Sequence, residues 1–105
     1  MNEIQDEHEG EFQISPQTLH AQARTAREAG YTQLAENFER AAELTAVPAP
    51  ELLRMYELLR PGRSSQEELL AVADELEQRY NARINATFVR EAAAVYLERS
   101  LFRKD

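Results

Sequence analysis

A helix stop in the middle of the chain divides the polypeptide into separate helices. Pro61 disfavours helical geometry at Arg60, and Gly62 admits backbone angles that are closed to other residues. A helix that runs through 58–59 is therefore expected to end at this point.

A helix start follows the stop almost immediately. Ser64 with Glu67, or Ser65 with Glu68, has the spacing of a capping box, in which the hydroxyl and the carboxylate each accept a hydrogen bond from an unpaired amide. Either pair predicts a new helix from about Ser65. Taken alone, such a junction is typical of an ordinary structural turn.

Start and end signals elsewhere predict three further helices. Ser15-Pro16 is typical of a helix start and Gly30 of a left-handed helix end. Apolar spacing and end signals give expected helices at 16–29, 32–47, 50–59, 65–80 and 84–100. The connection expected at 81–83 lacks Gly and Pro, so a frayed or continuous helix is the alternative there. Because no stretch alternates with period two, we predict an all-α fold, a small open bundle of about five helices.

Apolar residues at helical spacing indicate which face of each helix is buried. The expected inward residues are Leu34, Phe38, Ala41, Ala42 and Thr45 in the second helix, Leu52, Leu53, Tyr56 and Leu59 in the third, Leu69, Leu70, Ala73, Leu76 and Tyr80 in the fourth, and Ile84, Phe88, Ala92, Val95 and Tyr96 in the fifth. Small residues at 92–94 and the apolar pair Leu101 and Phe102 exceed what one small core needs. They could pack within the chain or against a partner, and packing within the chain is favoured by a narrow margin.

Acidic residues are concentrated at the N-terminus. Residues 1–13 contain Glu3, Asp6, Glu7, Glu9 and Glu11 without any Lys or Arg. We expect a flexible acidic tail over 1–13 and one helical domain over 14–105.

Composition excludes several classes of protein. The 105 residues contain no cysteine, so disulfides, thiolate metal sites and a cysteine nucleophile are excluded. A net charge of −7, without a basic stripe, argues against nucleic-acid binding. No apolar run approaches the roughly 20 residues of a membrane helix. We expect a cytoplasmic protein that binds neither nucleic acid nor membrane.

Catalytic groups are scarce. His8 and His20 lack the spacing of a metal pair, and the serines at 64–65 have a capping role and no neighbouring histidine. Carboxylate pairs such as 67–68 and 74–75 are typical of solvated helix faces. We therefore assign no catalytic, cofactor-binding or metal-binding residue to this chain.

Three blocks, taken in order, resemble a known family. They are Asn37-Phe38-Glu39-Arg40-Ala41-Ala42-Glu43-Leu44-Thr45-Ala46-Val47-Pro48, the run 60–77, and Phe88-Val89-Arg90-Glu91-Ala92-Ala93-Ala94-Val95-Tyr96-Leu97-Glu98-Arg99. In this order the chain, from about 14 to 103, resembles the small (gamma) subunit of adenosylcobalamin-dependent diol and glycerol dehydratases, known as propanediol and glycerol dehydratases.

The resemblance implies a structural role in a hydro-lyase complex. In the family, a large subunit holds the substrate, and the large and medium subunits enclose adenosylcobalamin, whose radical chemistry converts a 1,2-diol or glycerol to an aldehyde and water. The small subunit is an all-helical, non-catalytic piece on the outside of a dimer of heterotrimers. This chain is then expected to stabilise the holoenzyme by packing on the large subunit and to bind no cofactor itself.

Arginine and aromatic residues are favoured at interface cores. The candidate subunit contacts are Tyr56, Arg60, Arg63, Ser64, Phe88 and Arg90. For Tyr56 and Phe88, burial in the chain's own core is the stronger alternative.

Three features depart from the family pattern. The segment before the family-like region is short, which argues against microcompartment association. Gly62 stands where the family usually has an aromatic, and Leu101-Phe102 where charged residues are usual.

The alternative function is a stand-alone helical interaction module that derives from such a subunit and has no dehydratase partners. Substrate preference between diol and glycerol depends on another chain.

Overall fold

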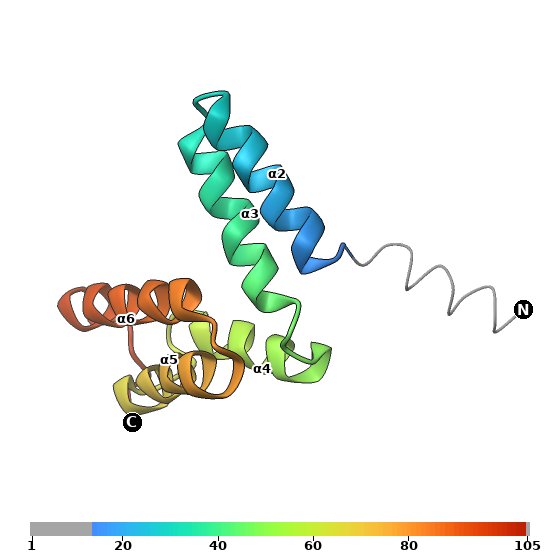
Figure 1. The fold of residues 1–105 in the computed structure, drawn as a ribbon. Coiled ribbons are helices and arrows are strands. Elements are labelled where there is room, and N and C mark those ends of the chain that lie inside the picture. The colour runs from blue at the N-terminus through green and yellow to red at the C-terminus, as the bar shows by residue number, and fades with distance from the viewer. Residues whose placement is uncertain (1–13, 105) are drawn as a thin grey trace, which may run out of the picture. The chain divides into compact units, whose positions relative to one another are not determined.

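In the part of the chain that the structure describes, the regular structure consists of five α-helices (Figure 1). The computed structural model describes residues 14–104. Its helices are α2 (Pro16–Glu28), α3 (Thr32–Leu44), α4 (Ala49–Leu59), α5 (Gln66–Tyr80) and α6 (Arg83–Glu98). Because the described residues contain no strand, the predicted all-helical fold is confirmed. The tail expected at 1–13 lies outside them.

The chain divides into two compact units. One is Met1–Ala42 and the other Glu43–Asp105, so the boundary falls near the end of α3. The single domain expected over 14–105 stays a prediction, and each unit is described by itself below.

Helices α2 and α3 of the first unit form a hairpin (Figure 1). The Ser15 side chain caps α2 by accepting from the Thr18 amide, and Gly30, with a φ of +88°, turns the chain after the helix, as expected. The small core consists of Ala23, Ala26 and Ala35, with Phe38 packed against it. Short side chains at these positions allow the two helices to approach closely.

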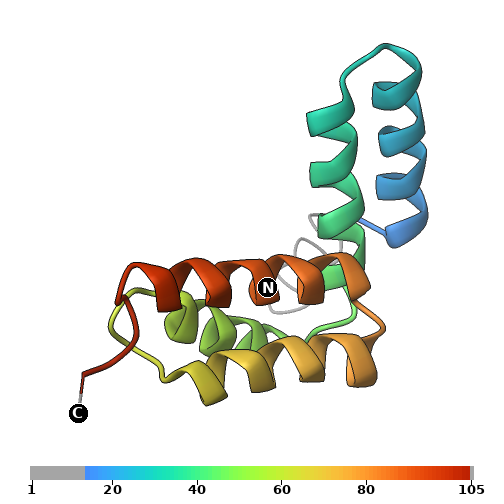
Figure 2. The ribbon, with the colours of Figure 1, turned by 90° about the vertical axis from the view of Figure 1, so that its left-hand side faces the viewer.

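The core of the second unit is built mainly between α5 and α6, which run antiparallel side by side (Figure 2). Larger side chains come from α5 and small ones from α6: the buried residues are Leu69, Val72, Ala73 and Leu76 on one side, and Ala82, Ala86, Val89 and Ala93 on the other. Met55 of α4 and Val47 complete the cluster. Alanines opposite leucines let the layers fit at the density of a protein interior.

The ends of α5 are defined by hydrogen bonds. The Ser65 hydroxyl accepts from the Glu68 amide, and the Glu68 side chain accepts from the Ser65 amide at 2.9 Å, so the 65/68 pair is the capping box. Asn81, with a φ of +53°, ends the helix. The chain therefore breaks at 81–82, within the connection expected at 81–83, and the alternative of one continuous helix is wrong.

A carboxylate from the end of α3 caps α6. Ala82, at the start of α6, offers no side-chain cap. Glu43 supplies it, since its carboxylate accepts from the amides of Ile84 and Asn85, each at 2.9 Å, and from the Asn85 side chain at 2.7 Å. Satisfying these unpaired amides stabilises the first turn.

The C-terminal segment packs on the junction between α4 and α5. The Gly62 amide donates to the Leu101 carbonyl at 2.8 Å, and the Arg103 amide donates to the Ser64 carbonyl at 2.7 Å. The ring of Phe102 packs edge-on against Tyr96 at 5.8 Å. The pair 101–102 is therefore used within the chain, as favoured from the sequence.

Several expected inward residues are exposed, so those predictions are wrong. Leu34, Leu53 and Tyr56 are examples, as are Leu70 of α5 and Ile84, Phe88 and Val95 of α6. On α4 the inward position is Met55, only 2% exposed, whereas Leu53 is 68% exposed. Size explains the error, because hydrophobic ranking favours large residues whereas close packing of helices selects small ones.

Within the described residues, none of the helices has the length and apolar character to cross a bilayer.

Truncating α4 at two positions tests the observed face. Met55→Ala is expected to lower the free energy of unfolding by about 2 to 5 kcal/mol because it empties a core position. Leu53→Ala should change it by less than about 0.5 kcal/mol. Urea unfolding followed by circular dichroism measures both. Equal losses would contradict the orientation of α4.

Removing the carboxylate that caps α6 tests the Glu43 contact. Glu43→Ala should cost about 1 kcal/mol, since the amides of residues 84 and 85 lose their acceptor. The control is Glu36→Ala on the same helix, at an exposed position that caps nothing. If the two variants unfold at the same urea concentration, Glu43 does not stabilise α6.

Candidate partner-binding surface

Two of the six candidate contact residues are exposed aromatics. Tyr56 on α4 is 52% exposed and Phe88 on α6 is 51% exposed. Burial in the chain's own core, the stronger alternative at the sequence level, is thus wrong for both. Large aromatic side chains at this exposure are suited to contact with another molecule.

Arg60 and Arg63, at the end of α4 and just after it, share one acceptor. Nη1 of Arg60 is 3.2 Å from a Glu57 carboxylate oxygen, and Nε of Arg63 is 3.6 Å from the other. All three side chains are more than half exposed. Exposed ion pairs of this kind contribute little to stability, so the guanidinium groups remain accessible.

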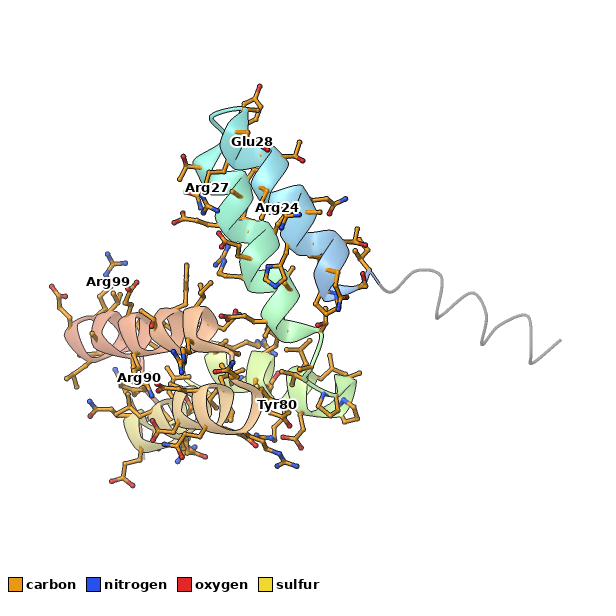
Figure 3. The ribbon with its side chains drawn as sticks, in the orientation of Figure 1. Arg24, Arg27, Glu28, Tyr80, Arg90 and Arg99 are labelled. Atoms are coloured by element: carbon orange, nitrogen blue, oxygen red, sulfur yellow. The ribbon has the colours of Figure 1, made fainter. Side chains whose placement is uncertain are left out.

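Arg90 faces the core side of α6 and bridges to α5. Its Nη2 is 2.9 Å from Asp74 and 2.7 Å from Glu77, and it lies between the two helices in Figure 3. Hydrogen bonds to Asp74 and then Glu77 raise the pKa of the guanidinium. Phe88 points the other way, because two residues correspond to about 200° around a helix. These two candidates therefore do not form one patch.

Ser64 is enclosed by the chain itself. It is 1% exposed, and within the described residues its hydroxyl oxygen has no hydrogen-bond partner. A side chain in this position offers nothing to a partner surface, so the structure does not group Ser64 with the other candidates. Contact roles for the remaining five stay predictions.

An outward apolar stripe on α6 was not predicted from the sequence. Ile84, Phe88 and Val95 were taken as core but lie on the exposed side. The signal that could have found it is the competing stripe of residues 82, 86, 89 and 93, whose small side chains fit a close helix pair.

The first unit carries a shallow apolar hollow of about 430 Å³ along its two helices. Tyr31, Leu34 and Phe38 line one side and alanines of α2 the other. Within the described residues there is no group of three or more His, Asp or Glu side chains that could hold a metal ion. Because its lining is mainly apolar, the hollow has the character of a contact surface.

Comparison with known proteins identifies the family. The sequence matches the family described as dehydratase small subunit over residues 2–103. The chain belongs to the dehydratase small subunit family.

Two relatives of this dehydratase small subunit chain are propanediol dehydratase small subunits. The protein of Citrobacter freundii is 56% identical over 95 residues, and that of Salmonella typhimurium (strain LT2) is 57% identical over 95 residues. Each match covers 90% of this chain and 55% of the relative. The chain therefore spans about half the length of the curated relatives it matches.

One carboxylate of this dehydratase small subunit chain joins the start of α5 to the C-terminal segment. The Glu68 carboxylate accepts from the Ser65 amide and, at 2.7 Å, from Nη1 of Arg103. The hydrogen bond from the Ser65 amide, followed by that from Arg103, lowers the pKa of Glu68. The ionised form thus stabilises the junction.

The lowered pKa of Glu68 predicts a pH-dependent stability. Its contribution is present above the ordinary unfolded pKa of about 4.3 and is lost as the pH falls through the lower folded value. Glu68→Gln should therefore destabilise the chain near pH 7, and its effect should shrink as the pH falls below about 4.3. Urea midpoints across this range measure the difference. Glu67→Gln is the control, and the same pH profile in both variants would refute the assignment.

Proposed function

We propose that this chain is the non-catalytic small subunit of a propanediol dehydratase that converts a 1,2-diol or glycerol to an aldehyde and water. The observation that carries the proposal is its 56–57% identity to two propanediol dehydratase small subunits over 90% of its length. Exposed aromatic and aliphatic side chains on α4 and α6 support it, since a subunit needs surface to bury in a complex.

The charged side chains support a structural role. Arg54 is 2.6 Å from Glu75 and 2.9 Å from Glu51, which ties α4 to α5, and Arg90 ties α6 to α5. Arg103 in turn ties the C-terminal segment to α5. These arginines hold helices together, so they are engaged in the fold and not in acid–base chemistry.

Adenosylcobalamin is expected to be held by other subunits. It supplies the radical chemistry of such enzymes when bound. A corrin with its amide side chains needs a deep pocket rich in polar partners, whereas the hollow along α2 and α3 is shallow and apolar. The described residues do not fit the cofactor, so we derive no step of the reaction from this chain.

In this proposal the partners are a large and a medium subunit, assembled as a dimer of heterotrimers in the cytoplasm. The small subunit packs on the large one and stabilises the holoenzyme. The preference for diol or glycerol then resides in the large subunit.

Co-expression with the large and medium subunits tests the proposed function. The chain should co-purify and elute in a complex far larger than its own 12.1 kDa. Omitting it should lower the yield or half-life of the dehydratase and leave KM for propanediol unchanged, because it supplies no substrate contact. Elution as free chain would contradict the proposal, and a stable self-assembled oligomer would instead support the stand-alone interaction module.

A further inference from the structure

The C-terminal segment, residues 100–103, folds back on the junction between α4 and α5, residues 60–65. Both belong to the second unit, and they lie side by side in Figure 2. Two backbone hydrogen bonds join them, from the Gly62 amide to the Leu101 carbonyl and from the Arg103 amide to the Ser64 carbonyl. The segment therefore fixes the backbone of the junction at two points.

The side-chain contacts of the C-terminal segment lie near the surface. The Phe102 ring meets Tyr96 edge-on and is only partly buried. Nη1 of Arg103 is 2.7 Å from the Glu68 carboxylate, but the two side chains are 41% and 44% exposed. Exposed ion pairs contribute little to stability, whereas α5 and α6 share a continuous buried core. Releasing the segment therefore leaves the main core of the unit in place.

The turn that brings the segment onto the junction has an unfavourable backbone conformation. Ser100 has a φ of +58°, and this turn lets the Leu101 amide donate to the Tyr96 carbonyl at 2.8 Å. Glycine is the usual residue at such a helix end, because a side chain in the left-handed region crowds the following carbonyl. When the segment is released, Ser100 can return to an ordinary conformation.

The closed segment also lies against an enclosed hydroxyl group. Ser64 is 1% exposed, and in residues 14–104 its hydroxyl oxygen has no hydrogen-bond partner. The Ser64 carbonyl accepts from the Arg103 amide, so the segment contacts this residue directly. Water can hydrogen-bond the hydroxyl once the segment moves away. Two unfavourable features thus belong to the closed segment and are relieved when it opens.

We propose that the C-terminal segment is a latch that opens and closes on an otherwise folded second unit. In the closed state it fixes the junction, which carries the exposed Arg60 and Arg63. In the open state Ser100 leaves the left-handed region, the Ser64 hydroxyl is hydrated, and α5 and α6 stay packed. The conformational freedom of the junction is therefore set by the latch. This inference does not depend on the proposed function.

Amide hydrogen exchange of the full chain, followed residue by residue by NMR, tests the latch. The Gly62 and Arg103 amides report its opening, because both bond across it. The Leu76 amide, in the buried part of α5, reports opening of the core. After correction for intrinsic rates, the two latch amides should exchange at least about a hundredfold faster than the Leu76 amide. Equal protection would mean that the segment opens only by global unfolding, and would overturn the proposal.

Two substitutions at one position separate the latch from ordinary surface exchange. Ser100→Gly removes the unfavourable turn conformation and should slow exchange of the Gly62 and Arg103 amides at least about fivefold. Ser100→Ala is the matched control, because it keeps a side chain in the left-handed region and should not slow exchange. Neither change alters the residues next to these two amides in the sequence. Equal rates in the two variants would contradict the latch.

Ser64→Ala distinguishes the latch from a purely structural burial of the hydroxyl. If opening hydrates the hydroxyl, the substitution slows exchange at Gly62 and Arg103 by at least about fivefold. If the hydroxyl stays enclosed when the segment opens, only the Leu76 amide becomes more protected, and the proposal is overturned. A protected Leu76 amide in each variant shows that α5 is folded.

Discussion

The close packing of α6 on α5 determines most of the second unit. Two alanines and a valine of α6, together with Ala82 just before it, let the helix backbone approach the leucines and valine of α5. That approach then directs the remaining residues of α6: Arg90 reaches across to Asp74 and Glu77, while Phe88 and its apolar neighbours are turned outward. The face of α6 that packs on α5 therefore determines both which residues form the core and which residues are exposed on the opposite side.

The helix ends could be predicted from the sequence because they depend on local chemistry. Ser15-Pro16, the capping box at 65–68 and the break near Asn81 each act through neighbouring backbone groups, and all lie where expected. Helix faces were harder, because they depend on which residues meet across the core. Met55 was passed over for Leu53 and Tyr56, and the alanines of α6 for Ile84, Phe88 and Val95. Glu43 as the cap of α6 is a contact over about forty residues that no local pattern indicates.

The candidate contact residues differ in accessibility because of the way the helices pack. Tyr56, Phe88, Arg60 and Arg63 are accessible, whereas Arg90 is engaged between helices and Ser64 is enclosed. Residue type alone favoured all six, since arginine and aromatics are common in interfaces. Only the packing of α6 distinguishes a guanidinium that joins two helices from one that can meet another chain.

The enclosed hydroxyl of Ser64 carries a thermodynamic penalty that the fold must absorb. A buried polar group without a partner disfavours folding by about 1 to 3 kcal/mol, and alanine has nearly the same volume without that group. The carbonyl of the same residue accepts a hydrogen bond from the Arg103 amide of the C-terminal segment. Replacing the Ser64 hydroxymethyl group by a methyl group would therefore raise the free energy of unfolding and leave the surface of the chain unchanged.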